Sequence, residues 1–335
     1  MTKKHLKIVC IGGGTGTFVA LRGLKFYPVE LSAIVTMSDS GGSKQRIRDE
    51  FGLLPTSDIR QCLVALADEN GGGGLLRKLF MYRFAKGQGI SGMTFGNLFM
   101  AALADVLGSQ EEAIRQTGKV LRIKGKVVPV SFTDTNLYAE YENGHVVTEE
   151  HLIDEPSHDG TLRITRAYLK PKAKANPQAL EAIKRADLIV LGPGDLFTSL
   201  IPNLLVDGVA EALDRAKAMK VYVLNLMTKY GQTYNFTARD HLDSLKQYLP
   251  ATVNYVLVNT TKLPQNALDV YAKHDERPVA DNLPRKPGYR VVRRDLASNT
   301  LVRKPKSDAL VRSLIRHDSQ KLAHALYSLL GKKKQ

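Results

Sequence analysis

A run of glycines directly after an apolar segment contains the residues best suited to chemistry. The apolar residues 8–11 are followed by Gly12, Gly13, Gly14, Thr15, Gly16 and Thr17, and then by residues 18–21 at helical spacing. This order predicts a buried parallel strand, a tight turn and the first turn of a helix. Glycine lets backbone N–H groups approach a ligand, and a helix N-terminus adds partial positive charge. The stretch therefore predicts a seat for phosphate or pyrophosphate, to which the two threonines add hydroxyl donors.

The glycine spacing differs from that of the common nucleotide-binding loops. A dinucleotide fingerprint has glycine at its first, third and sixth positions; Gly12 and Gly14 comply, but Thr17 does not. The Gly-Lys-Ser/Thr phosphate loop is also absent from this stretch. We expect a phosphate-bearing ligand other than an ordinary dehydrogenase cofactor. A glycine turn that serves only strand–helix packing is the alternative.

Three further predicted strands, at 31–37, 187–191 and 220–225, each run into a polar or glycine-rich turn. Ligands bind at the carboxyl ends of strands in open α/β sheets. The candidate ligand contacts at these turns are Ser38, Asp39, Ser43, Gly192, Gly194, Asn225 and Thr228. Asp39 also lies near the place where dinucleotide-binding folds hold an acidic residue for a ribose hydroxyl.

Two further candidates lie at the start of predicted helices. Arg60 would neutralise phosphate charge, or point to solvent, and Asn97 would contact a nucleoside, or cap the helix at 98–107. Asp58 or Ser57 would cap the helix at 59–67.

The pattern of elements predicts an α/β protein with a Rossmann-like, doubly wound, mainly parallel sheet. Residues 126–170 change to period two and predict inserted antiparallel strands. We expect one domain over 1–330 with a basic C-terminal region at 280–330, and a basic tail at 331–335. The expected helices are 18–26, 59–67, 75–84, 98–107, 110–121, 177–185, 238–248, 267–273 and 319–330.

Composition indicates a globular protein of the cytoplasm. The chain has 335 residues, of which 43% are hydrophobic and 24% charged. Its two cysteines, Cys10 and Cys62, are far apart in apolar settings, which favours a reduced compartment. Neither a membrane span nor a signal peptide is expected.

Net charge is +15, and residues 280–335 contribute +10 of it, with fourteen Lys and Arg against four Asp. The basic segment lacks the aromatic interleaving of a base-reading surface, so we expect no specific nucleic acid. We expect the basic segment to be a solvated face. The alternative is a docking face for an acidic partner, a membrane surface or a second copy of the chain.

Together these motifs resemble the YvcK family of bacterial proteins, the gluconeogenesis factors, within the larger CofD-like superfamily. The resemblance covers residues 7–325. It is carried by the motifs at 12–16, 39–43, 54–60, 95–98, 191–199 and 225–228.

The resemblance implies a Rossmann-like fold that binds UDP-N-acetylglucosamine or UDP-glucose. It also implies a role in cell shape and envelope synthesis during gluconeogenic growth, as a regulator rather than a catalyst. Some relatives resemble kinase substrates near the position of Ser319, which makes a Ser/Thr kinase and cell-envelope proteins the expected partners.

The CofD branch of the superfamily instead consists of magnesium-dependent transferases. They move a phospholactyl-type group from a nucleoside diphosphate donor to a deazaflavin precursor. Their pattern has two adjacent aspartates after the second strand, preceded by Asn-Thr; here Ser40 follows Asp39, and Thr36-Met37 replaces the pair. Asp39 with Asp58 remains a candidate Mg²⁺ pair, but the departure makes transferase chemistry less expected.

Three hypotheses stay open: a UDP-sugar-binding regulator, a CofD-like transferase, and an NAD(P)-binding protein. Other catalytic patterns are missing from the sequence. The eight histidines show no metal-ligand spacing, no serine lies in a nucleophile elbow, and neither cysteine has a basic neighbour.

Overall fold

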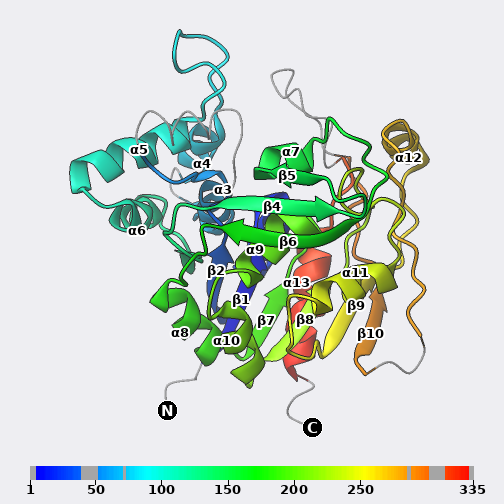
Figure 1. Cartoon of the computed structure of the whole chain (residues 1–335). Helices are drawn as coiled ribbons and strands as arrows, with labels where there is room; N and C mark the ends of the chain where they lie inside the picture. The colour runs from blue at the N-terminus through cyan, green and yellow to red at the C-terminus, as the bar shows by residue number, and fades with distance from the viewer. Residues whose placement is uncertain (1–4, 39–51, 71–72, 285–287, 302–313, 332–335) are drawn as a thin grey trace.

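A computed structural model describes residues 5–38, 52–70, 73–284, 288–301 and 314–331. Its centre is a seven-stranded parallel sheet with the strand order β10-β9-β8-β7-β1-β2-β3 (Figure 1). The strands are β1 (Leu6–Gly12), β2 (Val29–Val35), β3 (Lys126–Pro129), β7 (Leu188–Leu191), β8 (Met219–Val223), β9 (Tyr255–Asn259) and β10 (Arg290–Arg294). Strands β2 and β3 follow on one side of the β1–β7 pair, and β8, β9 and β10 follow on the other. This pair is therefore the switch point of the sheet.

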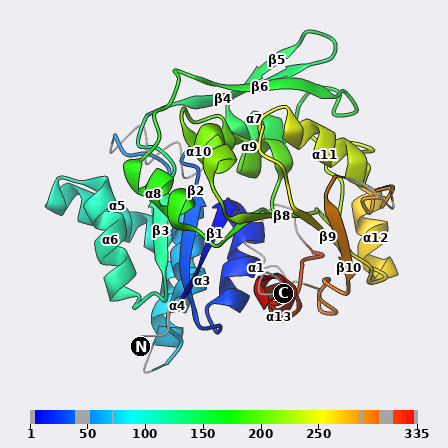
Figure 2. The same cartoon turned by 90° about the horizontal axis from the view of Figure 1, so that it is seen from below.

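Helices cover both faces of the sheet (Figure 2). Alternate residues of β1 point to opposite faces of the sheet. Ile8 and Cys10 pack with α1, α3 and α13 on one face, whereas Val9 and Ile11 pack with α8 to α11 on the other. The first group is α1 (Gly14–Leu24), α3 (Ser57–Leu66) and α13 (Ser319–Gly331), with α4 (Gly73–Met81), α5 (Phe95–Leu107) and α6 (Gln110–Val120) outside it. The second is α8 (Pro177–Arg185), α9 (Ile201–Leu204), α10 (Val209–Arg215) and α11 (Ala238–Lys246), preceded by the π-helix η1 (Leu196–Leu200). Helix α12 (Gln265–Ala272) connects β9 to β10.

A small antiparallel sheet, in the order β5-β4-β6, lies over the second group (Figure 2). It consists of β4 (Asn136–Tyr141), β5 (Val146–Thr148) and β6 (Ile164–Lys170), with α7 (Glu150–Asp154) between β5 and β6. The Tyr141 hydroxyl anchors it by donating to the Gly231 carbonyl at 2.9 Å.

The prediction that the antiparallel insertion begins at residue 126 is wrong. Residues 126–129 form β3, which pairs in parallel with β2 and belongs to the main sheet. A short apolar strand at the edge of a parallel sheet has the same local pattern as one in a hairpin, so periodicity does not distinguish them.

The other predicted elements are confirmed within a few residues, and two helix starts are informative. Helix α1 begins at Gly14, so Gly14 and Gly16 lie in its first turn, whereas Gly12 ends β1 and Gly13 is the N-cap. The expected cap of the last helix is confirmed, since the Asp318 carboxylate accepts from the N–H groups of Gln320 and Lys321, each at 2.9 Å. No helix in the described part of the chain is both long and apolar enough to span a membrane.

Candidate functional site

A cleft of about 1040 Å³ lies where the carboxyl ends of β1, β7 and β8 meet the loops that follow them. The ends of β1 and β7 are adjacent, with Ile11 paired to Leu191, so the loops after both strands converge. Parallel sheets bind ligands at such a switch point.

The glycine loop, residues 12–17, forms one part of this cleft. Gly13 to Gly16 line it, and Gly14 has a φ of +58°, in the left-handed region that favours glycine. A Cβ on Gly16 would lie 2.1 Å from the Pro193 carbonyl oxygen, so the loops after β1 and β7 are packed backbone against backbone. The first-turn N–H groups of α1 at this cleft provide the donors and the positive helix end that bind anions.

The Asp58 carboxylate lies directly against the glycine loop. A Cβ on Gly13 would come within 2.1 Å of Asp58 Oδ2, and a Cβ on Gly14 within 3.8 Å of its Oδ1. Asp58 is the second residue of α3, whose N-cap is Thr56, so it is not the helix cap that the sequence suggests. A carboxylate beside a phosphate seat fits one ligand position of a Mg²⁺ whose other ligands are phosphate oxygens.

Arg60 is a buried cation in the cleft wall. Its Nε donates to Asn97 Oδ1 at 3.0 Å, and its Nη1 lies 2.9 Å from Met81 Sδ. Burial and repulsion by Arg83 lower the Arg60 pKa to about 10, while Asp58 opposes the shift. The guanidinium therefore stays charged at neutral pH and is held in a fixed place.

A second group of charged residues, the Lys229 cluster, forms another part of the cleft. It consists of Asp154, Asp195, Lys229 and Glu276, from α7, the loop after β7, the loop after β8 and the segment after α12. Lys229 Nζ pairs with Asp195 Oδ2 at 2.6 Å and with the Asp154 carboxylate. The Lys229 and Asp154 side chains are only 14% and 11% exposed, so this pairing fixes the inserted sheet to the main sheet.

Glu276 carries a carboxyl group that titrates near neutral pH. Burial raises its pKa to about 7 and Asp195 adds to the shift, whereas Lys229 and the Tyr230 N–H oppose it. The charge of the Lys229 cluster therefore becomes more negative as the pH rises through 7.

The cleft brings together nine of the sequence-predicted site residues. These are Gly13, Gly14, Thr15, Gly16, Asp58, Arg60, Gly194, Asn225 and Thr228. Asn225 Nδ2 donates to the Gly194 carbonyl at 2.8 Å, and Thr228 Oγ1 accepts from the Arg277 N–H at 2.9 Å. Both side chains therefore hold loops of the cleft in place.

The other predicted residues lie behind the lining or outside the described residues. Thr17, Ser38 and Asn97 are buried, and neither they nor Gly12 and Gly192 line the cleft. Ser38 bonds to Thr36 Oγ1, while Asn97 bonds to Ser57 and Arg60, so these two support the wall. The N-cap of α5 is Thr94, not Asn97. Asp39 and Ser43 lie outside the described residues.

The Lys229 cluster is not among the site residues predicted from the sequence. Lys229 and Asp195 lie within one residue of predicted site residues, so those motifs could have indicated them. Asp154 and Glu276 have no local signal, because folding alone brings α7 and the segment after α12 to the cleft.

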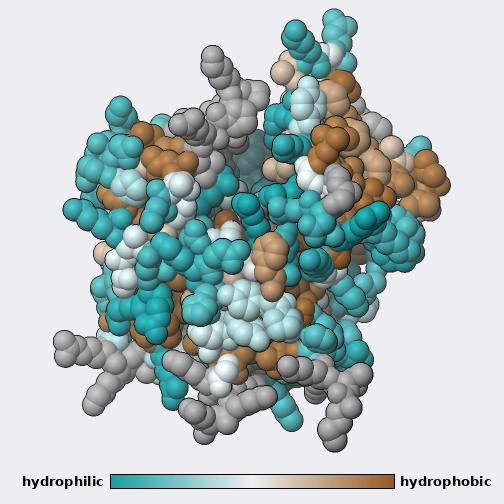
Figure 3. All heavy atoms as spheres, turned by 180° about the vertical axis from the view of Figure 1, so that it is seen from behind, coloured by the Kyte–Doolittle hydropathy of each residue, from teal (hydrophilic) through white to brown (hydrophobic). Residues whose placement is uncertain are grey.

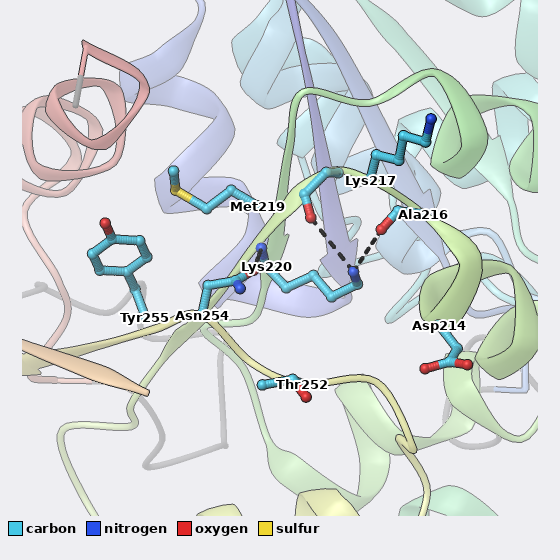
Figure 4. A pocket seen from close by; sticks show the side chains of 9 residues that line it. Asp214, Ala216, Lys217, Met219, Lys220, Thr252, Asn254 and Tyr255 are labelled. Carbon is cyan, nitrogen blue, oxygen red and sulfur yellow. Dashed lines mark hydrogen bonds between the residues drawn. The ribbon is translucent and has the colours of Figure 1, made fainter. Parts of the chain in front are cut away.

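A smaller hollow of about 410 Å³ lies at the opposite, amino end of β8 (Figure 4). Its buried Lys220 donates from Nζ to the carbonyls of Ala216 and Ala218, at 2.8 and 3.4 Å. Ala216 is the C-cap of α10, so this cation has a structural role at a helix end. The cleft with the glycine loop is therefore the candidate site.

Fold and cleft together define a doubly wound α/β protein with the N-terminus of a helix at a cleft on its switch point. The sequence profile described as "2-phospho-L-lactate transferase CofD" matches residues 8–297. The chain is 39% identical to the "Gluconeogenesis factor" of Bacillus subtilis, over 97% of this chain and 98% of that protein. It is 42% identical to the "Gluconeogenesis factor" of Halalkalibacterium halodurans, over 83% of this chain and 84% of that protein.

A solved structure agrees with these relatives. Protein BH3568 from Bacillus halodurans, also described as a member of the UPF0052 family, superposes with a TM-score of 0.87 at 36% identity. The superposition covers 97% of this chain and all of that one. The chain therefore belongs to the CofD family and, within it, to the gluconeogenesis factors.

Proposed function

We propose that the protein binds a nucleotide sugar, UDP-N-acetylglucosamine or UDP-glucose, in the cleft. The observation that supports this most strongly is the N-terminus of α1 at a cleft of about 1040 Å³ on the switch point of the sheet. A diphosphate fits this donor arrangement, and the remaining volume accommodates a nucleoside and a sugar.

The charges of the cleft favour one orientation of the ligand. The diphosphate lies on the glycine loop, where N–H groups and the buried Arg60 stabilise negative charge. The Lys229 cluster has three carboxyl groups for one ammonium, and Glu276 is only partly ionised near pH 7, so the cluster favours hydroxyl groups as hydrogen-bond donors over a phosphate. The sugar or the ribose therefore lies there.

Asp58 offers this proposal a place for magnesium. Its carboxylate adds negative charge beside the diphosphate, and Arg60 offsets part of that charge. When bound, Mg²⁺ would neutralise more of it. Asp58 would be its protein ligand, together with Asp39 as the sequence suggests, and the diphosphate would complete the shell.

The physiological part of the proposal is that the protein senses this metabolite and regulates cell shape and envelope synthesis in the cytoplasm during gluconeogenic growth. The name of the relatives supports the link to gluconeogenesis. A Ser/Thr kinase acting on Ser319, at the first turn of α13, and cell-envelope proteins are the proposed partners.

The description of the matching family favours a second candidate, a magnesium-dependent transferase that uses a nucleoside diphosphate donor. Both candidates share the diphosphate seat. They differ in whether the bound ligand is converted, so product analysis distinguishes them.

Isothermal titration with UDP-N-acetylglucosamine, UMP and NAD, each with Mg²⁺ and with EDTA, tests the proposal. We expect saturable binding of the nucleotide sugar that weakens in EDTA, weaker binding of UMP and NAD, and intact ligand afterwards by chromatography. Magnesium-dependent release of UDP would instead favour the transferase, and NAD binding more tightly than the nucleotide sugar would favour a dinucleotide-binding protein. Absence of nucleotide-sugar binding would overturn the proposal.

A further inference from the structure

Residues 73–94, here called the protrusion, combine α4 with a loop that stands out from the body of the protein (Figure 1). Backbone hydrogen bonds fix the base of this loop. Phe84 N–H donates to the Met93 carbonyl and Phe95 N–H to the Tyr82 carbonyl, both at 2.9 Å. The loop is therefore held in a hairpin-like shape.

The protrusion exposes large apolar side chains. Leu75 is 75% exposed, Leu79 40%, Met81 45%, Tyr82 53% and Ile90 37%. Leu75 and Leu79 lie four residues apart in α4 and therefore share one face, and Tyr82 follows directly after the helix. In Figure 3 hydrophobic residues gather at the base of the protrusion and over the neighbouring α5, whereas the tip of the loop is largely hydrophilic. Several exposed large apolar side chains on one projecting element indicate a site of interaction.

The charge of the same surface indicates an anionic partner. Residues 71–104 contain no Asp or Glu but include Arg77, Lys78, Arg83 and Lys86. Lys78 and Lys86 are exposed, and neither forms an ion pair within the described part of the chain. A second copy would bring the same positive charge to the interface, so charge opposes self-association through this surface.

The shape indicates a lipid surface rather than a protein. An amphipathic helix of a protein partner requires a groove, whereas the protrusion is convex (Figure 1). Apolar and tyrosine side chains on a projecting element enter the boundary between lipid headgroups and acyl chains, while lysine stems extend to the phosphates. We propose that the protrusion docks on an anionic membrane surface, with Leu75, Leu79, Tyr82 and Ile90 inserted and Lys78 and Lys86 at the headgroups.

This docking surface adjoins the cleft but does not depend on which ligand the cleft takes. Met81 and Arg83, at the base of the loop, also line the cleft. A ligand there would contact the root of the docking element.

Co-sedimentation of the full chain with phosphatidylcholine vesicles, with and without phosphatidylglycerol, tests the proposal. We expect binding only to the vesicles that contain phosphatidylglycerol. The double variant Lys78→Gln/Lys86→Gln should weaken it by about fivefold for each lysine. The double variant Leu79→Ser/Ile90→Ser should remove the binding that persists at high salt.

Matched variants outside the protrusion serve as controls. Lys119→Gln/Lys184→Gln removes two exposed lysines and Val120→Ser/Val146→Ser removes two exposed apolar side chains, and both should bind like the wild type. Equal weakening by the control lysine pair would overturn the proposal, as would absence of binding to anionic vesicles. A dimer in sedimentation equilibrium that Ile90→Ser dissociates would also overturn it. If the Leu79→Ser/Ile90→Ser variant unfolds, the comparison between the two lysine double variants still tests the proposal.

Discussion

The glycine loop and the Lys229 cluster line the same cleft but are built in opposite ways. The glycine loop offers backbone N–H groups and a helix dipole, all from one short stretch of chain. The Lys229 cluster offers side-chain charges from four separate segments, held together by ion pairs. The first favours anions, whereas the second has an excess of carboxylates. A ligand with a diphosphate at one end and hydroxyl groups at the other fits both.

The largest effect should come from a charge placed on the glycine loop. Gly14→Asp adds a carboxylate beside Asp58 and the proposed diphosphate, and should weaken nucleotide-sugar binding by about a hundredfold or more. Gly14→Ala is the matched control, because a Cβ there lies no closer than 3.8 Å to any side chain. The only expected penalty of the alanine is its left-handed backbone conformation, at a φ of +58°, which lowers the free energy of unfolding by about 1 kcal/mol. Titration calorimetry measures both, and equal losses would mean that charge is not the cause.

Removing the ammonium at the centre of the Lys229 cluster should affect stability more than phosphate binding. Lys229→Met leaves Asp154 and Asp195 close together without their cation, and should lower the free energy of unfolding by about 2 to 3 kcal/mol. Lys246→Met breaks an exposed pair with Asp243 and should change it by less than about 1 kcal/mol. Urea denaturation gives both values. A Lys229 variant as stable as the Lys246 variant would show that the cluster does not fix the inserted sheet.

The support of the glycine loop can be tested from the far side of α1. A Cβ on Gly23 would lie 1.9 Å from the Ser319 carbonyl oxygen and 2.7 Å from Ala323 Cβ. Gly23→Ala should therefore push α13 away and lower the free energy of unfolding by about 2 kcal/mol. Gly74→Ala, in the open first turn of α4, should leave stability unchanged or raise it by up to about 1 kcal/mol. Thermal unfolding should separate the two, and equal midpoints would contradict the close packing of α1 and α13.

The smallest predicted effect is a pH dependence of nucleotide-sugar binding that arises from Glu276 of the Lys229 cluster. Glu276 has a pKa raised to about 7, so it loses its negative charge as the pH falls from 8 to 6. Nucleotide-sugar binding should then tighten by about threefold, because the repulsion weakens while the diphosphate diester keeps its charge. Glu276→Gln should bind equally at both pH values, and the same slope in this variant would assign the effect to another group.

The raised pKa of Glu276 also makes the stability of the protein decrease as the pH rises. Because the folded pKa of Glu276 lies above its ordinary value near 4.5, its contribution opposes folding increasingly as the pH rises from about 4.5 to 7 and is constant above 7. Glu276→Gln should remove that part of the decline. Urea midpoints across this range, compared with the wild type, measure it.

The glycine loop and the sheet could be predicted from the sequence because their signals are local. Glycines after a buried strand and before a helix have few structural alternatives, and a parallel sheet places the loops after its strands at one edge. Residues 12–17 and the turns at 192–194 and 225–228 therefore indicated where the candidate cleft lies, although Gly12, Thr17 and Gly192 do not line it.

The Lys229 cluster and the edge of the sheet could not be predicted in the same way. Asp154 and Glu276 lie in stretches with no motif, and they reach the cleft because α7 and the segment after α12 fold over it. Strand β3 was assigned to the wrong sheet because pairing partners are not encoded in local period. Asn97 was a candidate ligand contact by residue type, but it is a buried support of Arg60.

The proposed diphosphate site is tested most directly by amide NMR of the perdeuterated protein, which maps the backbone N–H groups that respond to UDP-N-acetylglucosamine in the presence of Mg²⁺. The amides of Gly14, Thr15 and Gly16 should show the largest shifts, with smaller ones near Lys229, and UMP should shift the first set more weakly. Shifts near Lys229 with an unchanged glycine loop would contradict the claim that the N-terminus of α1 holds the diphosphate.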